Sequence, residues 1–419
     1  MRTGDESFRE IGTCRLCGCG ALESYLDFGH LPLGNDLRED ATAAKDAASY
    51  PLAVNRCPDC GHFQLAHAVA PELLYATNYT YLSGVGASFV RHFAEYAAWA
   101  AKTCDLPGGA LVVDVGSNDG TCLAAFKKSG FNVCGVDPAS MPAALANSAG
   151  IDTLNRFFDD VAVEEIVDRF GQADFVTSHN VLAHVDDLSA TFRRIHSLLK
   201  EGGFFAFEVG YFREVLEKGC FDTIYHEHLD YHHAAPLVRH LRSIGFDVID
   251  LSVVPVQGGS LRLLLRKTGK GDLSAGAAAF LEEEGCSILR DPVRLQEWST
   301  LIRQRMSRFG EAVKVRAERG LTVVGYGVPT KATLLMRVAG LDATHVAFMV
   351  EDNPLKRGRF TPGTGIAIFE PEELRRRRPE VVLIFAWNFS DDILSRLRMV
   401  VDWPIEYVVP LPDLEVGVL

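Results

Sequence analysis

The feature that most constrains the fold is a hydrophobic segment that leads directly into a glycine-containing turn. Residues 111–115 read Leu-Val-Val-Asp-Val, and residues 116–120 read Gly-Ser-Asn-Asp-Gly. A short, continuous apolar run of this kind is typical of a strand buried on both faces, as in the parallel sheets of α/β proteins. A helix is expected over 121–129 and a second strand over 131–136. This order predicts a doubly wound α/β domain.

The turn carries acids in place of the Gly-x-Gly-x-x-Gly cradle that dinucleotide enzymes use for a pyrophosphate. Asp114 and Asp119 would repel a diphosphate, but they suit a cofactor with a cationic amine and a sulfonium. Asp137 follows the next strand, at the place where an acid receives ribose hydroxyls. The combination predicts S-adenosylmethionine, and the alternative is an acidic loop in another kind of doubly wound domain.

A third strand, expected over 174–178, is followed by further polar residues. Side chains just past the carboxyl end of such a strand face the crevice of the sheet. Asn180 is therefore expected to contact the methionine part of the cofactor, and His184 either reaches the substrate or serves as a packing group. The predicted cofactor-binding residues are Asp114, Gly116, Ser117, Asn118, Asp119, Gly120, Asp137 and Asn180.

Two Cys-x-x-Cys pairs near the amino terminus predict a metal site. Each pair can place two thiolates on adjacent corners of a tetrahedron, so two pairs complete a closed zinc site that stabilises the fold. A redox pair is the alternative, and Cys19 and His30 rank below the four as ligands. The predicted zinc ligands are Cys14, Cys17, Cys57 and Cys60.

Residues 223–233 are rich in groups that can transfer protons. The segment reads Thr-Ile-Tyr-His-Glu-His-Leu-Asp-Tyr-His-His, with four of the thirteen histidines of the chain. Such a cluster is poor core material, because each buried imidazole needs a hydrogen-bond partner. Together with a cofactor turn about a hundred residues upstream, it indicates an enzyme that uses acid–base chemistry.

Composition limits the remaining possibilities. A chain of 419 residues suits two or three domains, and a net charge of −13 argues against nucleic-acid binding. The basic run 375–378 is interpreted as a solvated helix terminus. The first residues lack a signal-peptide core, and no apolar stretch is long enough to span a membrane. With its unpaired cysteines scattered, the chain is expected to be cytoplasmic, as a monomer or simple homo-oligomer.

A second α/β pattern occupies the carboxy-terminal part of the chain. Residues 320–326 form a strand that ends in a glycine turn, and further strands are expected over 345–350 and 381–386. The pattern predicts a second nucleotide-type α/β unit. A packing domain without a ligand is the alternative.

The chain resembles the deoxysugar C-methyltransferase family, which methylates nucleotide-linked 4-keto sugars with S-adenosylmethionine. The resemblance extends almost from end to end. Its motifs are the two cysteine pairs, Asn-Tyr-Thr-Tyr-Leu-Ser-Gly at 78–84, the turn at 114–120, Asn180 to His184, Tyr-His-Glu-His at 225–228, Gly-Gly-Ser-Leu-Arg at 258–262, Gly-Tyr-Gly at 325–327, Asp-Asn-Pro at 352–354 and Trp-Asn-Phe at 387–389.

The resemblance implies the architecture. An α/β protein is expected, with a small zinc-binding module, a central doubly wound Rossmann-like methyltransferase domain, and a second Rossmann-like domain that helps to bind the nucleotide-sugar. The expected boundaries are 1–85, 86–275 and 276–419.

The resemblance also implies the reaction. His228 would remove a proton next to the keto group, and the resulting enolate would take the methyl group from the cofactor. Tyr225, Glu227, Tyr79 and His184 would line the site, and the expected substrate is a thymidine- or guanosine-diphosphate sugar. The residues expected to bind that substrate are Ser260, Arg262 and Lys331.

Some positions depart from the family pattern. Gln257 stands where a histidine is usual, Val-Pro-Thr at 328–330 replaces small residues, and His232-His233 is atypical. These departures concern which sugar is bound. The alternatives to C-methylation are an O- or N-methyltransferase on a sugar or related polar metabolite, and a zinc-bearing nucleotide-binding scaffold without activity.

Overall fold

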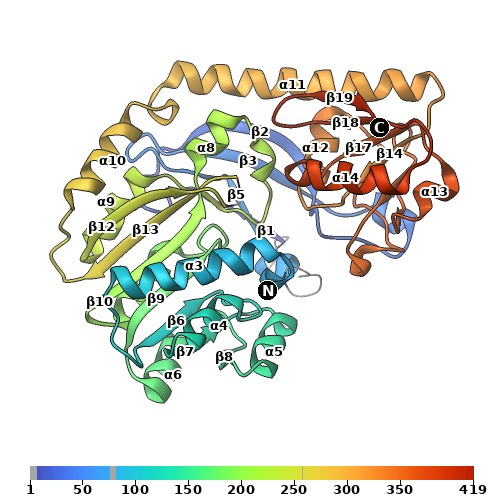
Figure 1. Cartoon of the computed structure of the whole chain (residues 1–419). Helices are drawn as coiled ribbons and strands as arrows, with labels where there is room; N and C mark the ends of the chain where they lie inside the picture. Colours follow the sequence, from blue (N-terminus) through green and yellow to red (C-terminus); the bar gives the residue numbers. More distant parts are fainter. Residues whose placement is uncertain (1–6, 76–81, 257) are drawn as a thin grey trace, which may run out of the picture.

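The computed structural model describes residues 7–75, 82–256 and 258–419, which form three parts (Figure 1). Residues 223–233, the His-rich segment, pair with a strand of the first part. The amino-terminal part contains two small sheets, one of two strands and one of four. Its elements are β1 (Phe8–Glu10), β2 (Glu23–Pro32), α1 (Ala41–Lys45), β3 (Ser49–Arg56), β4 (Phe63–Leu65), β5 (His67–Val69), α2 (Pro71–Tyr75) and the 3₁₀ turn η1 (Ser83–Val85).

The four-stranded sheet of this part is completed from far along the chain. Its order is β11-β4-β3-β2, and β11 (Asp230–Tyr231) belongs to the His-rich segment. The two strands pair antiparallel, with Asp230 opposite Gln64 and Tyr231 opposite Phe63. The His-rich segment is therefore a strand of the zinc-binding part as well as a loop of the central domain.

The central part is a seven-stranded sheet in the order β12-β13-β10-β9-β6-β7-β8. From β12 to β10 neighbouring strands are antiparallel, and the others are parallel. Its elements are α3 (Ala87–Thr103), β6 (Leu111–Val115), α4 (Thr121–Lys128), β7 (Asn132–Val136), α5 (Ser140–Ser148), β8 (Thr153–Leu154), α6 (Asp160–Phe170), β9 (Ala173–His179), α7 (Leu188–Leu198), β10 (Leu199–Gly210), α8 (Phe212–Lys218), η2 (Phe221–Thr223), α9 (Ala234–Ile244), β12 (Phe246–Val254), β13 (Ser260–Lys267) and α10 (Ala275–Gly285).

The strand order reverses between β6 and β9, because β7 and β8 continue to one side of β6 and β10 to the other. A doubly wound sheet opens a crevice at such a point, outside the carboxyl ends of the strands. The predicted doubly wound domain is confirmed, and β6 has the bounds expected from the sequence.

The carboxy-terminal part is a six-stranded sheet in the order β16-β15-β14-β17-β18-β19, parallel except for the final hairpin. It reverses between β14 and β17. Its elements are β14 (Val323–Tyr326), α12 (Ala332–Ala339), β15 (Phe348–Val350), η4 (Pro354–Lys356), β16 (Ile368–Phe369), α13 (Glu373–Arg377), β17 (Val381–Ile384), η5 (Trp387–Phe389), α14 (Ser390–Val400), β18 (Glu406–Val409) and β19 (Glu415–Val418).

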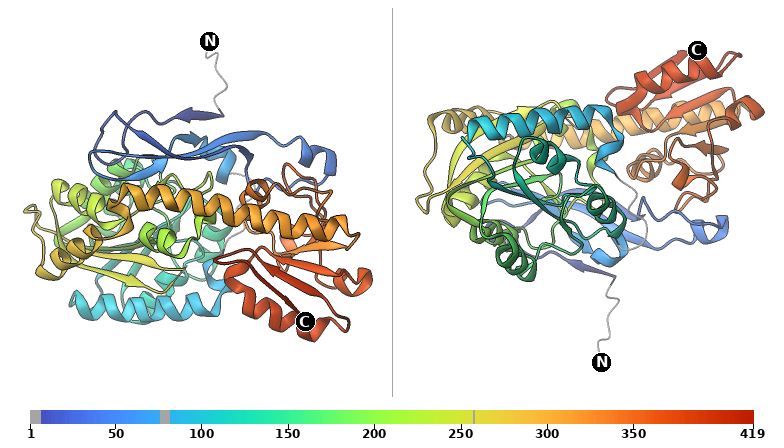
Figure 2. Two further views of the ribbon diagram at one scale, coloured as in Figure 1. Left: turned by 90° about the horizontal axis from the view of Figure 1, so that it is seen from above. Right: turned by 60° about the horizontal axis from the view of Figure 1, so that its bottom comes forward.

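A long helix, α11 (Pro292–Glu318), follows the short turn η3 (Ile288–Arg290) and runs from the central part to the carboxy-terminal part (Figure 2). The Asp291 side chain caps it by accepting from the backbone N–H groups of Val293 and Arg294. Its buried face joins one hydrophobic core with the amino-terminal strands, the His-rich segment and the carboxy-terminal sheet. Among the described helices, none has the length and apolarity needed to cross a membrane.

Candidate active site

The four predicted cysteines converge at the start of the chain. Their sulfur atoms all lie within 4.8 Å of one another, with Cys14 Sγ 3.6 Å from Cys60 Sγ and Cys17 Sγ 3.5 Å from Cys57 Sγ. Four sulfurs at about 2.3 Å from a tetrahedral zinc lie about 3.8 Å apart, so the cluster fits that ion. The zinc would complete a closed structural site and leave no ligand position for chemistry.

The crevice of the seven-stranded sheet is built by the glycine turn. Asp114 is the penultimate residue of β6 and has only 3% of its surface exposed, and its Oδ1 accepts no hydrogen bond from the described residues. Burial raises the pKa of Asp114 well above its usual value. Gly116 has φ +77°, and a Cβ atom there would lie 2.2 Å from Val181 Cγ2. An orphaned buried carboxylate beside a cradle that excludes side chains fits a cationic cofactor.

The next acid, Asp137, lies at the end of β7 and faces the same turn. Its two oxygens accept from the backbone N–H groups of Asn118 and Ala139, each at 2.8 Å. Burial raises the pKa of Asp137, although both hydrogen bonds oppose that shift. An acid held at this point can still accept from the two hydroxyls of a ribose.

The other polar groups of the turn fix a neighbouring segment. Asn118 Oδ1 accepts from Ser83 N at 2.9 Å, and Asp119 Oδ2 accepts from Gly84 N at 2.8 Å. Asp119 also accepts from the Thr121 hydroxyl at 2.6 Å. Asp119 therefore ties the stretch before α3 to the turn, a role that the sequence did not indicate. The structure also places Ser117, Gly120 and Asn180 at the crevice edge, with Asn180 at φ +56°. Tyr79 lies outside the described residues.

The His-rich segment lies against the loop that follows β9, at the edge of this crevice. Leu229 N donates to Ala183 O at 2.7 Å, and His184 Nδ1 donates to the Glu227 carbonyl at 2.7 Å. The rings of His184 and His228 meet edge to face, with centroids 4.8 Å apart. The structure thus brings His184, Tyr225, Glu227 and His228 together beside the predicted cofactor site.

The hydrogen bonds of His228 define its tautomer. Nδ1 lies 2.8 Å from the Thr223 carbonyl, which can only accept, so Nδ1 carries the proton. Nε2 then accepts from the Tyr225 hydroxyl at 2.9 Å. Burial lowers the pKa of His228 to about 3, and that of His184 to about 4, which keeps both rings neutral. The group that holds the ring is thus a backbone carbonyl, that of Thr223, and not the carboxylate of the neighbouring Glu227.

Glu227 points toward the other parts of the chain. Its Oε1 accepts from Asn35 Nδ2 at 2.8 Å, and Asn35 Oδ1 in turn accepts from the Thr330 hydroxyl at 2.9 Å. Burial raises the pKa of Glu227 to about 7, although Asn35 and Lys356 favour its ionised form. Sequence reasoning missed Asn35, because a lone asparagine in the loop between β2 and α1 carries no local signal.

The three residues expected to bind substrate make contacts within the protein. Ser260 is buried in β13 and donates to Val256 O at 3.1 Å. Arg262 Nε donates to Glu208 at 2.7 Å, and the Arg262 guanidinium stacks on Trp99. Lys331 Nζ lies 3.0 Å from the buried carboxylate of Asp222. Their assignment to the substrate stays a prediction.

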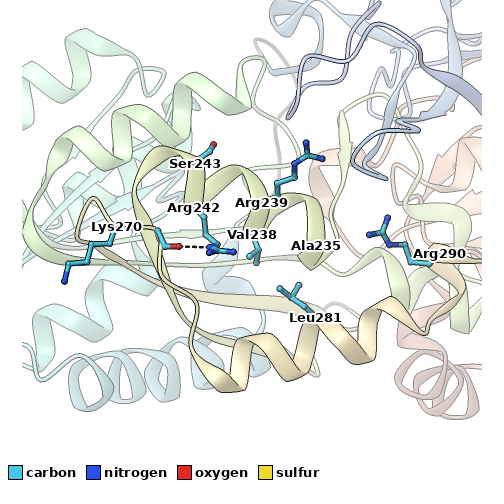
Figure 3. A pocket seen from close by; sticks show the side chains of 9 residues that line it. Ala235, Val238, Arg239, Arg242, Ser243, Lys270, Leu281 and Arg290 are labelled. Carbon is cyan, nitrogen blue, oxygen red and sulfur yellow. Dashed lines mark hydrogen bonds between the residues drawn. The ribbon is translucent and has the colours of Figure 1, made fainter.

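A surface pocket of about 560 Å³ lies away from this site, between α9, α10 and the β12–β13 side of the sheet (Figure 3). Arg242 Nε crosses it to donate to the Gly271 carbonyl at 2.6 Å. None of the predicted site residues lines it. The lining residues are Ala235, Val238, Arg239, Arg242, Ser243, Lys270, Gly271, Leu281 and Arg290.

Three family models match consecutive parts of the chain. Residues 14–75 match "Putative zinc binding domain", residues 89–251 match "Methyltransferase domain", and residues 255–412 match "C-methyltransferase C-terminal domain". The predictions of a zinc-binding part, a methyltransferase domain and S-adenosylmethionine as cofactor are confirmed. The three models do not test the predicted boundaries.

One curated relative matches almost the whole chain, and others match parts of it. The C-methyltransferase NovU of Streptomyces niveus is 31% identical over 406 residues, which cover 97% of this chain and 96% of that protein. A ubiquinone biosynthesis O-methyltransferase of Erwinia tasmaniensis is 33% identical over 107 residues, 25% of this chain and 44% of that protein. Among solved structures, the magnesium protoporphyrin IX methyltransferase of Synechocystis PCC 6803 with bound S-adenosylmethionine matches at TM-score 0.33 and 18% identity, over 43% of this chain and 79% of that one. The chain belongs to the family of S-adenosylmethionine-dependent C-methyltransferases.

Proposed function

We propose that the protein methylates a carbon next to the keto group of a nucleotide-diphosphate-linked 4-keto-deoxysugar, with His228 as the base. The observation that carries the proposal is the hydrogen bond between His228 and Tyr225. His228 is neutral, and the lone pair on its Nε2 accepts from the Tyr225 hydroxyl. The near-complete match to the C-methyltransferase NovU supports methylation on carbon.

The residues can perform the proton transfer in a defined order. A hydrogen next to a ketone is acidic because the charge left behind spreads onto oxygen. His228 Nε2 takes this hydrogen as a proton, while the Thr223 carbonyl continues to hold Nδ1–H and stabilises the imidazolium. The Tyr225 hydroxyl, released from Nε2, donates to the enolate oxygen.

The cofactor supplies the methyl group to the enolate carbon. The chain contributes the alignment of the two reactants. Asp114, Asp137 and the glycine turn would hold the cofactor, and the His-rich segment would hold the sugar. No step requires the closed cysteine site.

The test separates proton abstraction from methyl transfer. Without cofactor, the wild-type protein should wash deuterium into the carbon next to the keto group of a 4-keto nucleotide sugar. His228→Ala should lower both exchange and turnover by about 10²–10⁴-fold, the range for a general base, and leave cofactor affinity nearly unchanged. Mass spectrometry and NMR of the product from a panel of 4-keto nucleotide sugars identify the substrate.

His226 provides the matched control, because its ring is buried and its Nε2 lies 3.2 Å from the Tyr50 carbonyl. His226→Ala should affect stability more than turnover per folded molecule. Full activity of His228→Ala would refute the assignment of the base. A methyl group found on oxygen or nitrogen would refute the proposed reaction class.

A further inference from the structure

A buried acid lies two residues after His228 and has no part in the proposed chemistry. The side chain of Asp230 is fully buried, and although burial opposes ionisation, the Arg15 guanidinium and the hydrogen bond to His62 hold the pKa of Asp230 below its usual value. Arg15 Nε lies 3.0 Å from both carboxylate oxygens, and His62 Nε2 lies 2.8 Å from Oδ1. The carboxylate is thus held from two sides.

Both partners belong to the cysteine knuckles. Arg15 stands between Cys14 and Cys17, and His62 comes two residues after Cys60. Their side chains are 6% and 0% exposed. Each is fixed by the backbone of its knuckle, since the His62 carbonyl accepts from Cys57 N at 2.8 Å and Arg15 N donates to Gln64 at 2.8 Å. A shift of either knuckle would therefore move a partner of Asp230.

The backbone on both sides of Asp230 follows the same knuckles. Leu65 N donates to the Leu229 carbonyl at 2.9 Å, and Asp230 pairs with Gln64 in the ladder between β11 and β4. Further along, His233 Nε2 donates to the Gly61 carbonyl at 3.0 Å. Arg15 also donates to the Val185 carbonyl, one residue after His184. The zinc-binding part therefore reaches both histidines of the proposed site.

We infer that Asp230 is a positioning residue, and that the Asp230–Arg15–His62 cluster transmits the geometry of the zinc knuckles to His228. The inference rests on the proposed function only in giving His228 the proton-transfer step. A buried carboxylate is stable only with its partners in place, so the cluster admits one arrangement of the segment at low energy. Misplacing a catalytic group by about 1 Å can cost about 10²-fold in rate.

The test is Asp230→Asn, which keeps the shape of the side chain and removes its charge. Turnover and cofactor-free deuterium exchange should fall together, by about 10- to 100-fold. Zinc content per chain, the dissociation constant for S-adenosylmethionine and the KM for the sugar should stay within about twofold, since none of these depends on the angle of His228. Arg15→Lys, which keeps the charge and loses the contact to two oxygens, should cause a smaller fall of the same kind.

Glu284→Gln is the matched control. Glu284 is 2% exposed, accepts from Ala234 N and Ala235 N, and lies 3.3 Å from His233 Nδ1, so its loss costs stability at the far end of the segment without contact to Arg15 or His62. It should unfold more easily yet keep the turnover per folded molecule. Normal turnover and exchange in folded, zinc-loaded Asp230→Asn and Arg15→Lys would overturn the inference, as would equal losses in Glu284→Gln. An active His228→Ala would instead refute the proposed base, so the two failures are distinguishable.

Discussion

The two large sheets of this protein begin with the same local unit, a strand, a glycine turn, a second strand and an acid. In the central sheet Gly116 N donates to Val136 O at 2.8 Å, and in the carboxy-terminal sheet Gly327 N donates to Val350 O at 2.8 Å. The residue after each carbonyl is an acid. Asp137 accepts from Asn118 N and Ala139 N, while Glu351 accepts from Val328 N and Asn353 N.

The units differ two residues before the glycine. The central sheet has Asp114, a buried acid with an orphaned oxygen. The other sheet has Gly325, where a Cβ would lie 2.3 Å from Met349 Sδ, so apolar side chains fill the space. At this one position the central sheet keeps an unsatisfied polar atom, which favours a ligand, whereas in the carboxy-terminal sheet apolar side chains occupy the space.

The second crevice also holds a carboxylate of its own chain. Asp222 accepts from Trp387 Nε1 at 2.5 Å and from Lys331 Nζ at 3.0 Å, and the Lys331 ammonium lies over the Trp387 ring. Asp222 precedes Thr223, whose carbonyl orients His228. One α/β unit therefore presents the predicted cofactor surface, while the other holds the segment that carries the proposed base, His228.

Lowering the pH is expected to have the largest effect on stability, and it should destabilise the central sheet before the carboxy-terminal sheet. Burial lowers the pKa of seven histidines that all lie between residues 179 and 240, in five cases to about 3 or 4. The unfolded chain binds protons at these sites from about pH 6.5 downward and the folded chain does not, so stability should fall steeply from pH 6.5 toward 4.

The raised pKa values of Glu227, Asp114 and Asp137 act in the opposite direction, but these groups are fewer. Denaturant unfolding at a series of pH values measures the fall. Hydrogen exchange, corrected for its intrinsic pH dependence, should show β9, β10 and β11 losing protection before β14, β15 and β17. Equal loss of hydrogen-exchange protection in both sheets, or a gain in stability at low pH, would contradict this prediction.

The next largest effect concerns the ion pair between Asp222 and Lys331, which holds the segment that carries the proposed base. Asp222→Ala leaves the Lys331 ammonium without its buried partner, which should cost about 3–5 kcal/mol of unfolding free energy. Turnover should fall as well, through Thr223, while the dissociation constant for S-adenosylmethionine changes less than about twofold. Urea unfolding and calorimetry measure the two quantities.

The double variant Asp222→Leu with Lys331→Met removes both charges and should recover part of the lost stability. A large loss of cofactor affinity in Asp222→Ala would show that the second sheet is not separate from the cofactor site.

Local patterns in the sequence were sufficient for much of the fold. The apolar run 111–115 became β6, and the paired cysteines form one cluster, because both patterns depend on neighbours in the chain. The helix α11 was not identified, because its many charged residues dilute an apolar face that only the assembled core explains.

The site shows the same limit. The composition of the His-rich segment was enough to identify it as a candidate site. Its strand β11, however, pairs with residues more than 160 positions earlier, and no local pattern encodes such a pairing. The orienting group of His228 is the Thr223 carbonyl, and every residue has a carbonyl. Lys331, which is predicted to bind the substrate, pairs with Asp222 in the structure, and a sequence alone could not reveal this partner.

The smallest expected effect is on cofactor affinity, and it is tested by comparing the two equivalent acids, Asp137 and Glu351. Asp137→Ala should weaken S-adenosylmethionine binding by about 1.5–3 kcal/mol, the scale for hydrogen bonds to a charged group. Glu351→Ala removes an acid with the same two backbone contacts, so both variants should lose similar stability. Calorimetric titration should find the cofactor affinity of Glu351→Ala within about twofold of wild type, because Gly325 leaves no polar opening beside it. If both variants bind the cofactor as wild type does, Asp137 only supports the turn. If both bind it weakly, the two crevices are energetically coupled and the division between a cofactor sheet and a gripping sheet fails.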